Sequence, residues 1–204
     1  MVKKPANTET QADEATVDKH AQDKSEKRAD AATAKQQDEK DEDLSEEDQQ
    51  LKGELLMLVE RLMEPNTELH KHALENIRSL IRTSTSSMTS VPKPLKFLRP
   101  HYAELEEVYQ RWPSGSNKLE LADVLSVLGM TYAEDGRRDS LKYRLLGTNE
   151  DPGLWGHEYV KHLSAEIGVE YEERVKEDAA TDDLLELAMV IVPYFLKHNA
   201  EADA

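Results

Sequence analysis

The stretch NKLELADVLSVLGMTYAEDG, residues 117–136, decides the fold, because apolar side chains occupy nearly every face of a helix between Leu119 and Tyr132. A helix that is apolar all round is buried between other helices and does not lie at a surface. Asp135 and Gly136 are typical of the turn that ends such a segment. The sequence therefore predicts a central helix that needs helical neighbours on several sides.

Two amphipathic helices are expected upstream of this segment. In DLSEEDQQLKGELLMLVERLMEP, residues 43–65, Ser45 is placed to cap a helix and Pro65 to stop it. The next helix is capped by Asn66 or Thr67 and fades into the Ser/Thr run at 83–87. Each carries an apolar face: Leu51, Leu55, Leu58, Val59 and Leu62 in the first, and Leu69, Ala73, Leu74, Ile77, Leu80 and Ile81 in the second. The two helices predict a helical hairpin.

Further helices are expected on both sides of the central one. One begins near Pro100 and ends at PSGSN, residues 113–117. Downstream, SLKYRLLG at 140–147 is a short helix, a long helix follows within 149–178, and a last helix begins at Thr181. The inward residues are Tyr102, Leu105, Val108, Tyr109 and Trp112, and then Trp155, Tyr159, Leu163, Ile167, Tyr171 and Val175. Pro193 is expected to kink the last helix.

No segment shows the period-two alternation of a half-buried strand. We therefore expect an all-α fold of stacked antiparallel helical hairpins, similar to HEAT-like solenoids, over residues 44–204. The last helix contains LLELAMVIVPYFL, residues 184–196, which is apolar on almost every face. We interpret this surface as one that a partner or further sequence covers, and we expect the helical domain to be incomplete at its C-terminus.

Residues 1–43 contain no Leu, Ile, Phe, Tyr or Trp, which predicts a disordered charged tail. The net charge of −16 disfavours nucleic acid and anionic membranes as partners. Without cysteine, the chain has no disulfides, thiolate metal sites or Cys nucleophile. The N-terminus lacks a secretory signal, and the longest apolar run, 187–196, is too short to span a bilayer. We therefore expect a soluble intracellular protein.

The strongest indication of an enzyme is HEYVKH, residues 157–162. Zinc peptidases use H-E-x-x-H to place two imidazoles one helical turn apart, with the Glu as general base. Here the histidines are five residues apart, which separates them by roughly 140° around a helix. We therefore expect no metal ligands, and likewise no catalytic or cofactor-binding residues. A metal-dependent hydrolase using His157, Glu158 and His162 stays an alternative.

Two other histidines, His70 and His72, lie two residues apart in the second helix. At that spacing their side chains point to different sides of the helix, so they form no pair. We expect both at the surface.

The segment VPKPLKFLRP, residues 91–100, is conspicuously basic for so acidic a chain. A proline disfavours helical conformation in the residue before it, so we expect an extended connector pinned by Leu95, Phe97 and Leu98. The cations along this region, Arg82, Lys93, Lys96 and Arg99, can bind acidic helix ends, and the last three are our partner-contact candidates. An intramolecular connector, a partner-binding loop and a phosphorylated switch in the Ser/Thr run 83–90 all remain open.

SSMTSVPKPLKFLRPHY, residues 86–102, together with SLKYRLLG and with WGHEYVKHLSAEI at 155–167, resembles the N-terminal region of the largest non-ATPase subunit in the base of the 26S proteasome regulatory particle. The resemblance extends over residues 44–204. It implies an all-helical segment that leads into a toroid of proteasome/cyclosome repeats, in a scaffold that holds ubiquitin, shuttle receptors and a deubiquitinase beside the ATPase ring. The toroid is absent from this sequence, so no receptor residue is carried over.

The resemblance implies a non-catalytic scaffold segment that acts in ubiquitin-dependent protein degradation, in the cytoplasm and nucleus, with ATPase-ring subunits of the base as partners. Its expected mechanism is the burial of apolar helix ridges against neighbouring helices, while charged rims select the partner. Besides the hydrolase, the alternative is an acidic chaperone-like or histone-binding protein that uses the tail, where acidic residues outnumber basic ones.

Overall fold

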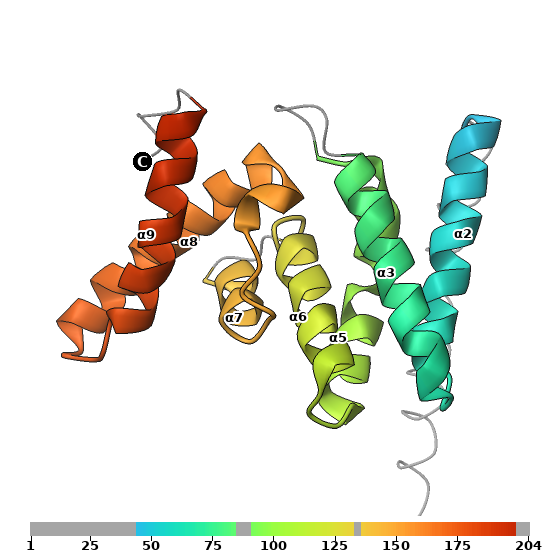
Figure 1. Cartoon of the computed structure of the whole chain (residues 1–204), viewed down its shortest axis with the longest axis horizontal. Coiled ribbons are helices and arrows are strands. Elements are labelled where there is room, and N and C mark those ends of the chain that lie inside the picture. Colours follow the sequence, from blue (N-terminus) through green and yellow to red (C-terminus); the bar gives the residue numbers. More distant parts are fainter. Residues whose placement is uncertain (1–43, 85–90, 133–135, 199–204) are drawn as a thin grey trace, which may run out of the picture. The chain divides into compact units, whose positions relative to one another are not determined.

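The computed structural model describes residues 44–84, 91–132 and 136–198 (Figure 1). The predicted disordered tail, 1–43, and residues 85–90 of the predicted phosphorylation segment lie outside the described residues. The chain divides into two units, Met1–Gln49 and Gln50–Ala204. In the described part of the first unit, Oγ of Ser45 accepts a hydrogen bond from N of Asp48 at 3.2 Å, which confirms the predicted cap.

The described residues form helices and turns and no strand, which confirms the all-α prediction. The elements are α2 (Glu46–Met63), α3 (Thr67–Thr83), α4 (Lys93–Leu98), the 3₁₀ helix η1 (Arg99–His101), α5 (Tyr102–Arg111), α6 (Ser116–Gly129), α7 (Asp139–Leu145), the 3₁₀ helix η2 (Pro152–Trp155), α8 (His157–Lys176) and α9 (Asp182–Lys197). In the unit Gln50–Ala204, α6 packs against α3, α5 and α7, and α8 packs against α7 and α9. None of the described helices combines the length and the apolar character that a bilayer span requires.

The central helix is α6, as the apolar residues between Leu119 and Tyr132 predict. Nine consecutive residues, 121–129, are buried on every face of it. The helix ends at Gly129, earlier than the predicted end at Asp135 and Gly136. A β-carbon on Gly129 would lie 3.0 Å from N of Ser140, so a side chain at this position would require α7 to move by a few tenths of an ångström. The carbonyl of Leu128, in the last turn of the helix, accepts hydrogen bonds from the hydroxyl of Thr131 at 2.7 Å and from its backbone N at 2.9 Å.

The first hairpin also follows its sequence pattern. Most of the predicted faces of α2 and α3 is buried, while Leu51, Leu69 and Leu80 are half-buried. The residues at 1% exposure or less are Leu55, Leu58, Val59, Leu62, Ala73, Leu74, Ile77 and Ile81. The structure decides between the two candidate caps of α3, because Oδ1 of Asn66 accepts a hydrogen bond from N of Glu68 at 3.2 Å. The buried apolar faces and the side-chain cap at the turn are therefore those that the hairpin prediction requires.

The prediction of an extended connector at 91–100 is wrong for residues 93–100, which form α4 and η1, while Val91 and Pro92 precede the helix. Pro94 lies in the first turn of α4, where a backbone N–H has no partner within the helix and its loss costs little. The helical form buries Leu95 and Leu98 completely, while Phe97 packs half-buried against the core. Apolar burial therefore outweighs the extended preference that Pro94 and Pro100 impose on Lys93 and Arg99.

Only the first part of the apolar face predicted for α8 is buried. Trp155 of η2 and Tyr159, Leu163 and Ile167 of α8 are buried, as predicted. Val175 is 55% exposed, and Tyr171 one turn before it is also exposed. The spacing continues beyond the point where neighbouring helices cover it, so periodicity alone overestimates the length of the buried face.

Candidate protein-binding surfaces

The three predicted partner-contact residues lie on one short helical segment. Lys93 and Lys96 are one turn apart on α4, Arg99 opens η1, and all three are exposed. Buried Leu95 and Leu98 anchor the same segment to the core. The cations are therefore carried on an anchored helix and not on the extended connector that we expected.

Arg82, expected among these cations, belongs to an internal network of ion pairs. Arg82 and Arg78 of α3 both donate to the carboxylate of Glu150, Arg78 at 2.5 Å. Arg78 also pairs with Glu120 of α6 at 3.1 Å. The guanidinium of Arg82 lies over the ring of Trp155, 4.5 Å from its centroid. These contacts join α3 to α6, η2 and the loop after α7.

The loop after α7 is shaped to deliver Glu150 to the two arginines. Asn149 adopts a φ of 60°, a left-handed conformation that asparagine tolerates better than most residues. Before it, the backbone N and the hydroxyl of Thr148 donate to the carboxylate of Asp123 at 3.0 and 2.6 Å. Burial raises the pKa of Asp123, while the bonds from Thr148 act in the opposite direction. A β-carbon on Gly147 would overlap Oδ1 of Asp123, so this approach requires glycine.

A second network joins α5 to α7. The hydroxyl of Tyr102 donates to Asp139 at 2.9 Å, and that of Tyr143 donates to Glu106 at 2.8 Å. Arg137 pairs with Asp139 at 2.5 Å. Burial, and then the adjoining carboxylates, raise the pKa of both phenols above the usual value of a tyrosine. Both phenols therefore stay neutral donors whose role is to hold two helices together.

A third network joins α7 to α8. The carboxylate of Glu166 accepts a hydrogen bond from the backbone N of Leu141 at 2.7 Å, at the start of α7. Glu170 pairs with Arg174 at 2.8 Å and with Arg138 at 2.6 Å. The hydrogen bond from Arg174, followed by the charge of Arg138, lowers the pKa of Glu170 even though partial burial acts against it. Charged side chains in this region therefore bind one another across helices.

The histidines of HEYVKH have separate roles. The ring of His157 faces Tyr194 and Phe195 of α9, with centroids 6.0 and 5.9 Å away. Nε2 of His162 lies 2.8 Å from a carboxylate oxygen of Glu166 on its own helix. Within the part of the chain that the structure describes, no group of three His, Asp or Glu residues has the arrangement to hold a metal ion. Their positions follow the 140° separation that the spacing indicates.

The prediction that His70 lies at the surface is wrong, since its exposure is only 4%. Its ring stacks on the indole of Trp112, with centroids 4.4 Å apart. Nε2 of His70 donates to the carbonyl of Glu64 at 2.7 Å, beyond the end of α2. The ring buries its apolar face and satisfies its polar edge, and neither partner is apparent from the local sequence.

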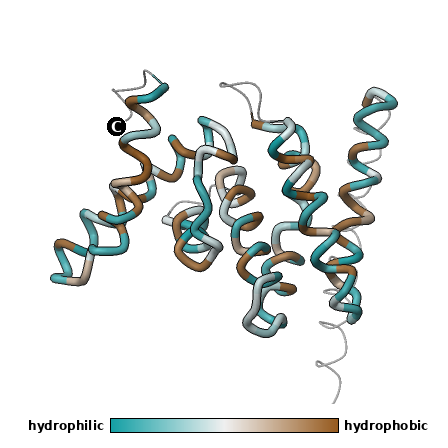
Figure 2. Tube along the Cα trace, viewed as in Figure 1, coloured by the Kyte–Doolittle hydropathy of each residue, from teal (hydrophilic) through white to brown (hydrophobic). Residues whose placement is uncertain are grey.

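The last helix carries the most extensive apolar surface. Its buried stripe, Leu184, Leu187, Ile191 and Phe195, packs inward. A second set, which we call the α9 stripe, is exposed and consists of Leu185, Met189, Val192 and Leu196. Met189 is 75% exposed, and helical geometry places this stripe about 125° around the axis from the buried one. Figure 2 shows the resulting brown colour along α9. The expectation of an uncovered apolar surface on the last helix is confirmed.

Comparison with known proteins shows one family over most of the chain. The family described as the RPN1 N-terminal domain matches residues 55–204. The chain is 59% identical over 175 residues to the 26S proteasome regulatory subunit rpn-1 of Neurospora crassa, and 58% identical over 163 residues to rpn1 of Schizosaccharomyces pombe. It is 54% identical over 159 residues to the 26S proteasome non-ATPase regulatory subunit 2 homolog A of Arabidopsis thaliana.

These alignments differ in how much of each protein they cover. They include 85%, 80% and 78% of this chain, but only 19%, 18% and 18% of the three relatives. The chain therefore spans less than a fifth of the length of the curated relatives that it matches.

Proposed function

Since this chain belongs to the family of the RPN1 N-terminal domain, we propose that it is a non-catalytic scaffold segment of the 26S proteasome regulatory particle. It acts in ubiquitin-dependent protein degradation through contacts with other proteasome subunits, in the cytoplasm and nucleus. Subunits of the ATPase ring in the base are the proposed partners. The observation that carries this proposal is the match of residues 55–204 to a family whose relatives are named proteasome regulatory subunits.

The structure supports a mechanism in which helices held in a fixed arrangement offer their surfaces to a partner protein. The three ion-pair networks hold α3, α5, α6, α7 and α8 in one arrangement. Surfaces carried on these helices are therefore presented to a partner without a large ordering cost. Complete burial of one Leu or Met side chain contributes about 1.5–3 kcal/mol, so the partly exposed α9 stripe can supply several kcal/mol to docking.

The two alternatives gain no support. The hydrolase needs His157 and His162 on one ion, whereas the structure engages them with α9 and with Glu166 respectively. The acidic chaperone depends on the tail, residues 1–43, which lies outside the described residues. Neither idea agrees with the names of the relatives.

A chimera tests the proposal in living cells. In S. pombe rpn1, which is 58% identical over the aligned region, the matching segment is replaced by residues 44–204 of this chain. We expect the chimera to support growth as the sole copy and to migrate with assembled 26S proteasomes on native gels. A chimera that accumulates as a folded protein but stays outside the regulatory particle would overturn the proposal.

Two matched variants separate assembly from folding. Leu74→Asp places a charge in the fully buried seam of α3 and is expected to abolish accumulation of the chimera. Glu75→Ala, at the adjacent exposed position, is expected to behave as the unmodified chimera. Equal incorporation of both variants would show that the folded helical body is not what the proteasome recognises.

A further inference from the structure

One arginine of the helical body is buried without an ion-pair partner among the described residues. Arg144 of α7 is 4% exposed, and its buried Nε has no hydrogen-bond partner. Among the residues that the structure describes, none forms a hydrogen bond or an ion pair with this guanidinium. By contrast, Arg78 pairs with three carboxylates and Arg138 with two. Buried charges in proteins are normally paired, so a guanidinium that no described carboxylate pairs with is able to bind an acidic ligand.

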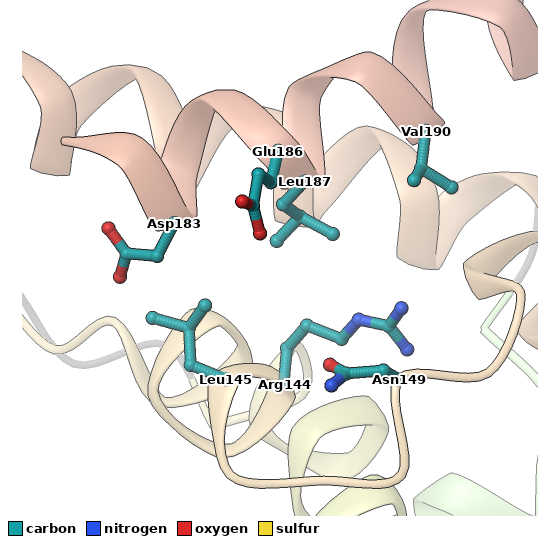
Figure 3. Close-up of a pocket in the computed structure, with 7 residues that line it drawn as sticks. All are labelled: Arg144, Leu145, Asn149, Asp183, Glu186, Leu187 and Val190. Carbon is teal, nitrogen blue, oxygen red and sulfur yellow. The ribbon is translucent and has the colours of Figure 1, made fainter.

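The unpaired guanidinium lies in a pocket of about 380 Å³ that α7, the loop after it and α9 enclose (Figure 3). Figure 3 shows the guanidinium pointing along the pocket toward Asn149, on the side away from Asp183. The apolar walls are formed by Leu145, Leu187 and Val190. The pocket therefore offers a charged interior and apolar sides, the combination that binds an amphipathic group.

The two carboxylates that line the pocket leave Arg144 unpaired. Asp183 accepts a hydrogen bond from Arg174 at 2.7 Å and forms no ion pair with Arg144. Glu186 is exposed and forms no ion pair with Arg144. The pocket thus has a cation inside and anions at its margin, a pattern that favours an acidic group flanked by basic ones.

We propose that this pocket docks an acidic side chain of a partner protein, a Glu or Asp on an amphipathic helix whose carboxylate pairs with Arg144. Apolar neighbours of that residue pack on Leu145, Leu187 and Val190, and flanking lysines or arginines meet Asp183 and Glu186. The site deepens the proposed scaffold function, on which it rests, by naming the chemistry of a partner.

The charge balance selects a carboxylate over a phosphate. A guanidinium binds either group with two parallel hydrogen bonds. A phosphate carries nearly two negative charges and would enter a pocket that Asp183 and Glu186 also line, in a chain whose net charge is already −16. A single carboxylate neutralises Arg144 with less repulsion from the margin. A helix is the favoured carrier, because apolar side chains at helical spacing can follow the groove beside α9.

A pair of peptides tests the proposal on the full chain of 204 residues. The probe is an acetylated, amidated helical 18-mer with leucines at positions i, i+3, i+4 and i+7, one central Glu and two flanking Lys. The matched peptide replaces the Glu by Gln. Titration into ¹⁵N-labelled protein is expected to show at least about tenfold tighter binding of the Glu peptide, because a charge-assisted pair is strong when buried. The shifted resonances should lie on α7 and α9 and include the Nε–Hε signal of Arg144.

Variants of the pocket show whether Arg144 is responsible. Arg144→Met removes the charge at similar volume and should equalise the two peptides, while Arg144→Lys should keep part of the preference. Val190→Asp, at a 47% exposed position of the pocket wall, adds a negative charge beside the site and should weaken the Glu peptide selectively. Val169→Asp, at a 50% exposed position outside the pocket lining, is its control and should bind like the unmodified chain.

Each outcome has one meaning. Equal binding of the two peptides, no binding of either, or an unchanged preference in Val190→Asp overturns the docking site. The last readout stands even if Arg144→Met fails to fold, which circular dichroism would reveal. The assay contains no proteasome subunit, so a negative result leaves the chimera result intact. A chimera that fails while the peptide preference persists would overturn the scaffold function instead.

Discussion

The guanidinium of Arg82 lies 4.5 Å from the centroid of the Trp155 ring, and the same guanidinium donates to Glu150. One side chain of α3 thereby contacts both η2 and the loop before it. In the sequence Arg82 resembles part of a basic surface. In the structure it joins α3 to segments about 70 residues away in the chain.

We expect Glu150→Ala to lower the free energy of unfolding by about 1–3 kcal/mol, because it leaves Arg78 and Arg82 without their common partner. Urea unfolding at neutral pH measures this change. The matched control is Glu75→Ala, which removes an exposed pair with Lys71 at 3.9 Å and should cost less than about 0.5 kcal/mol. Equal costs at both positions would show that the Glu150 network does not hold the fold.

We expect Gly147→Ala to destabilise the protein by about 1–3 kcal/mol, because the added β-carbon overlaps the carboxylate of Asp123. Thermal unfolding followed by circular dichroism measures the loss. Gly168→Ala is the control, since a β-carbon at that position of α8 meets nothing within 4 Å. It should stabilise the helix by about 0.5–1 kcal/mol, and a loss of stability there would contradict the geometry of α8.

Glu170 makes the stability of the protein sensitive to acid. Its pKa is lowered in the folded state, chiefly by the hydrogen bond from Arg174, and a free Glu has a pKa of about 4.3. The resulting stabilisation is complete above the unfolded pKa and is lost as pH falls through the lower folded pKa. Glu170→Gln should therefore be less stable than the unmodified protein at pH 7, with a difference that shrinks toward pH 3.

Urea unfolding at a series of pH values between 7 and 3 measures that difference. The control is Glu172→Gln, which changes a 75% exposed carboxylate on the same helix and should alter stability by less than about 0.5 kcal/mol throughout. A difference for Glu170→Gln that grows on acidification would reverse the assigned direction of its pKa.

The α9 stripe is expected to serve binding and not folding. Met189→Glu changes a side chain that is 75% exposed, so the melting temperature should stay within about 2 °C of the original. In the S. pombe chimera the same variant should reduce incorporation into the regulatory particle severalfold, as measured on native gels. Undiminished incorporation would show that the partner surface lies elsewhere on the chain.

Much of the helical organisation was predictable because its causes are local. Apolar residues at helical spacing predicted α2, α3 and α6, and the two cap residues, Ser45 and Asn66, were both among the candidates. Backbone hydrogen bonds within a helix join residues four apart, so a short window of sequence contains most of the information about its start and its apolar face.

Errors arose where distant residues outweighed a local preference. The prolines of 91–100 favour extended backbone, yet burial of Leu95 and Leu98 stabilises a helix there. His70 is polar and follows an exposed turn, yet Trp112 covers its ring. In both cases the decisive contact comes from another element, which no local window contains.

By itself the sequence determined the all-α class, the order of the helices and, through long stretches of unusual composition, the family. Only the tertiary structure decided which charges are paired and which are not. It placed Arg82 on Trp155 and Glu150, and it left Arg144 buried in the wall of a pocket, with no ion pair to any described carboxylate. The physical reason is that helix formation depends on residues a few positions apart, whereas the pairing of a buried charge depends on where distant helices bring their side chains.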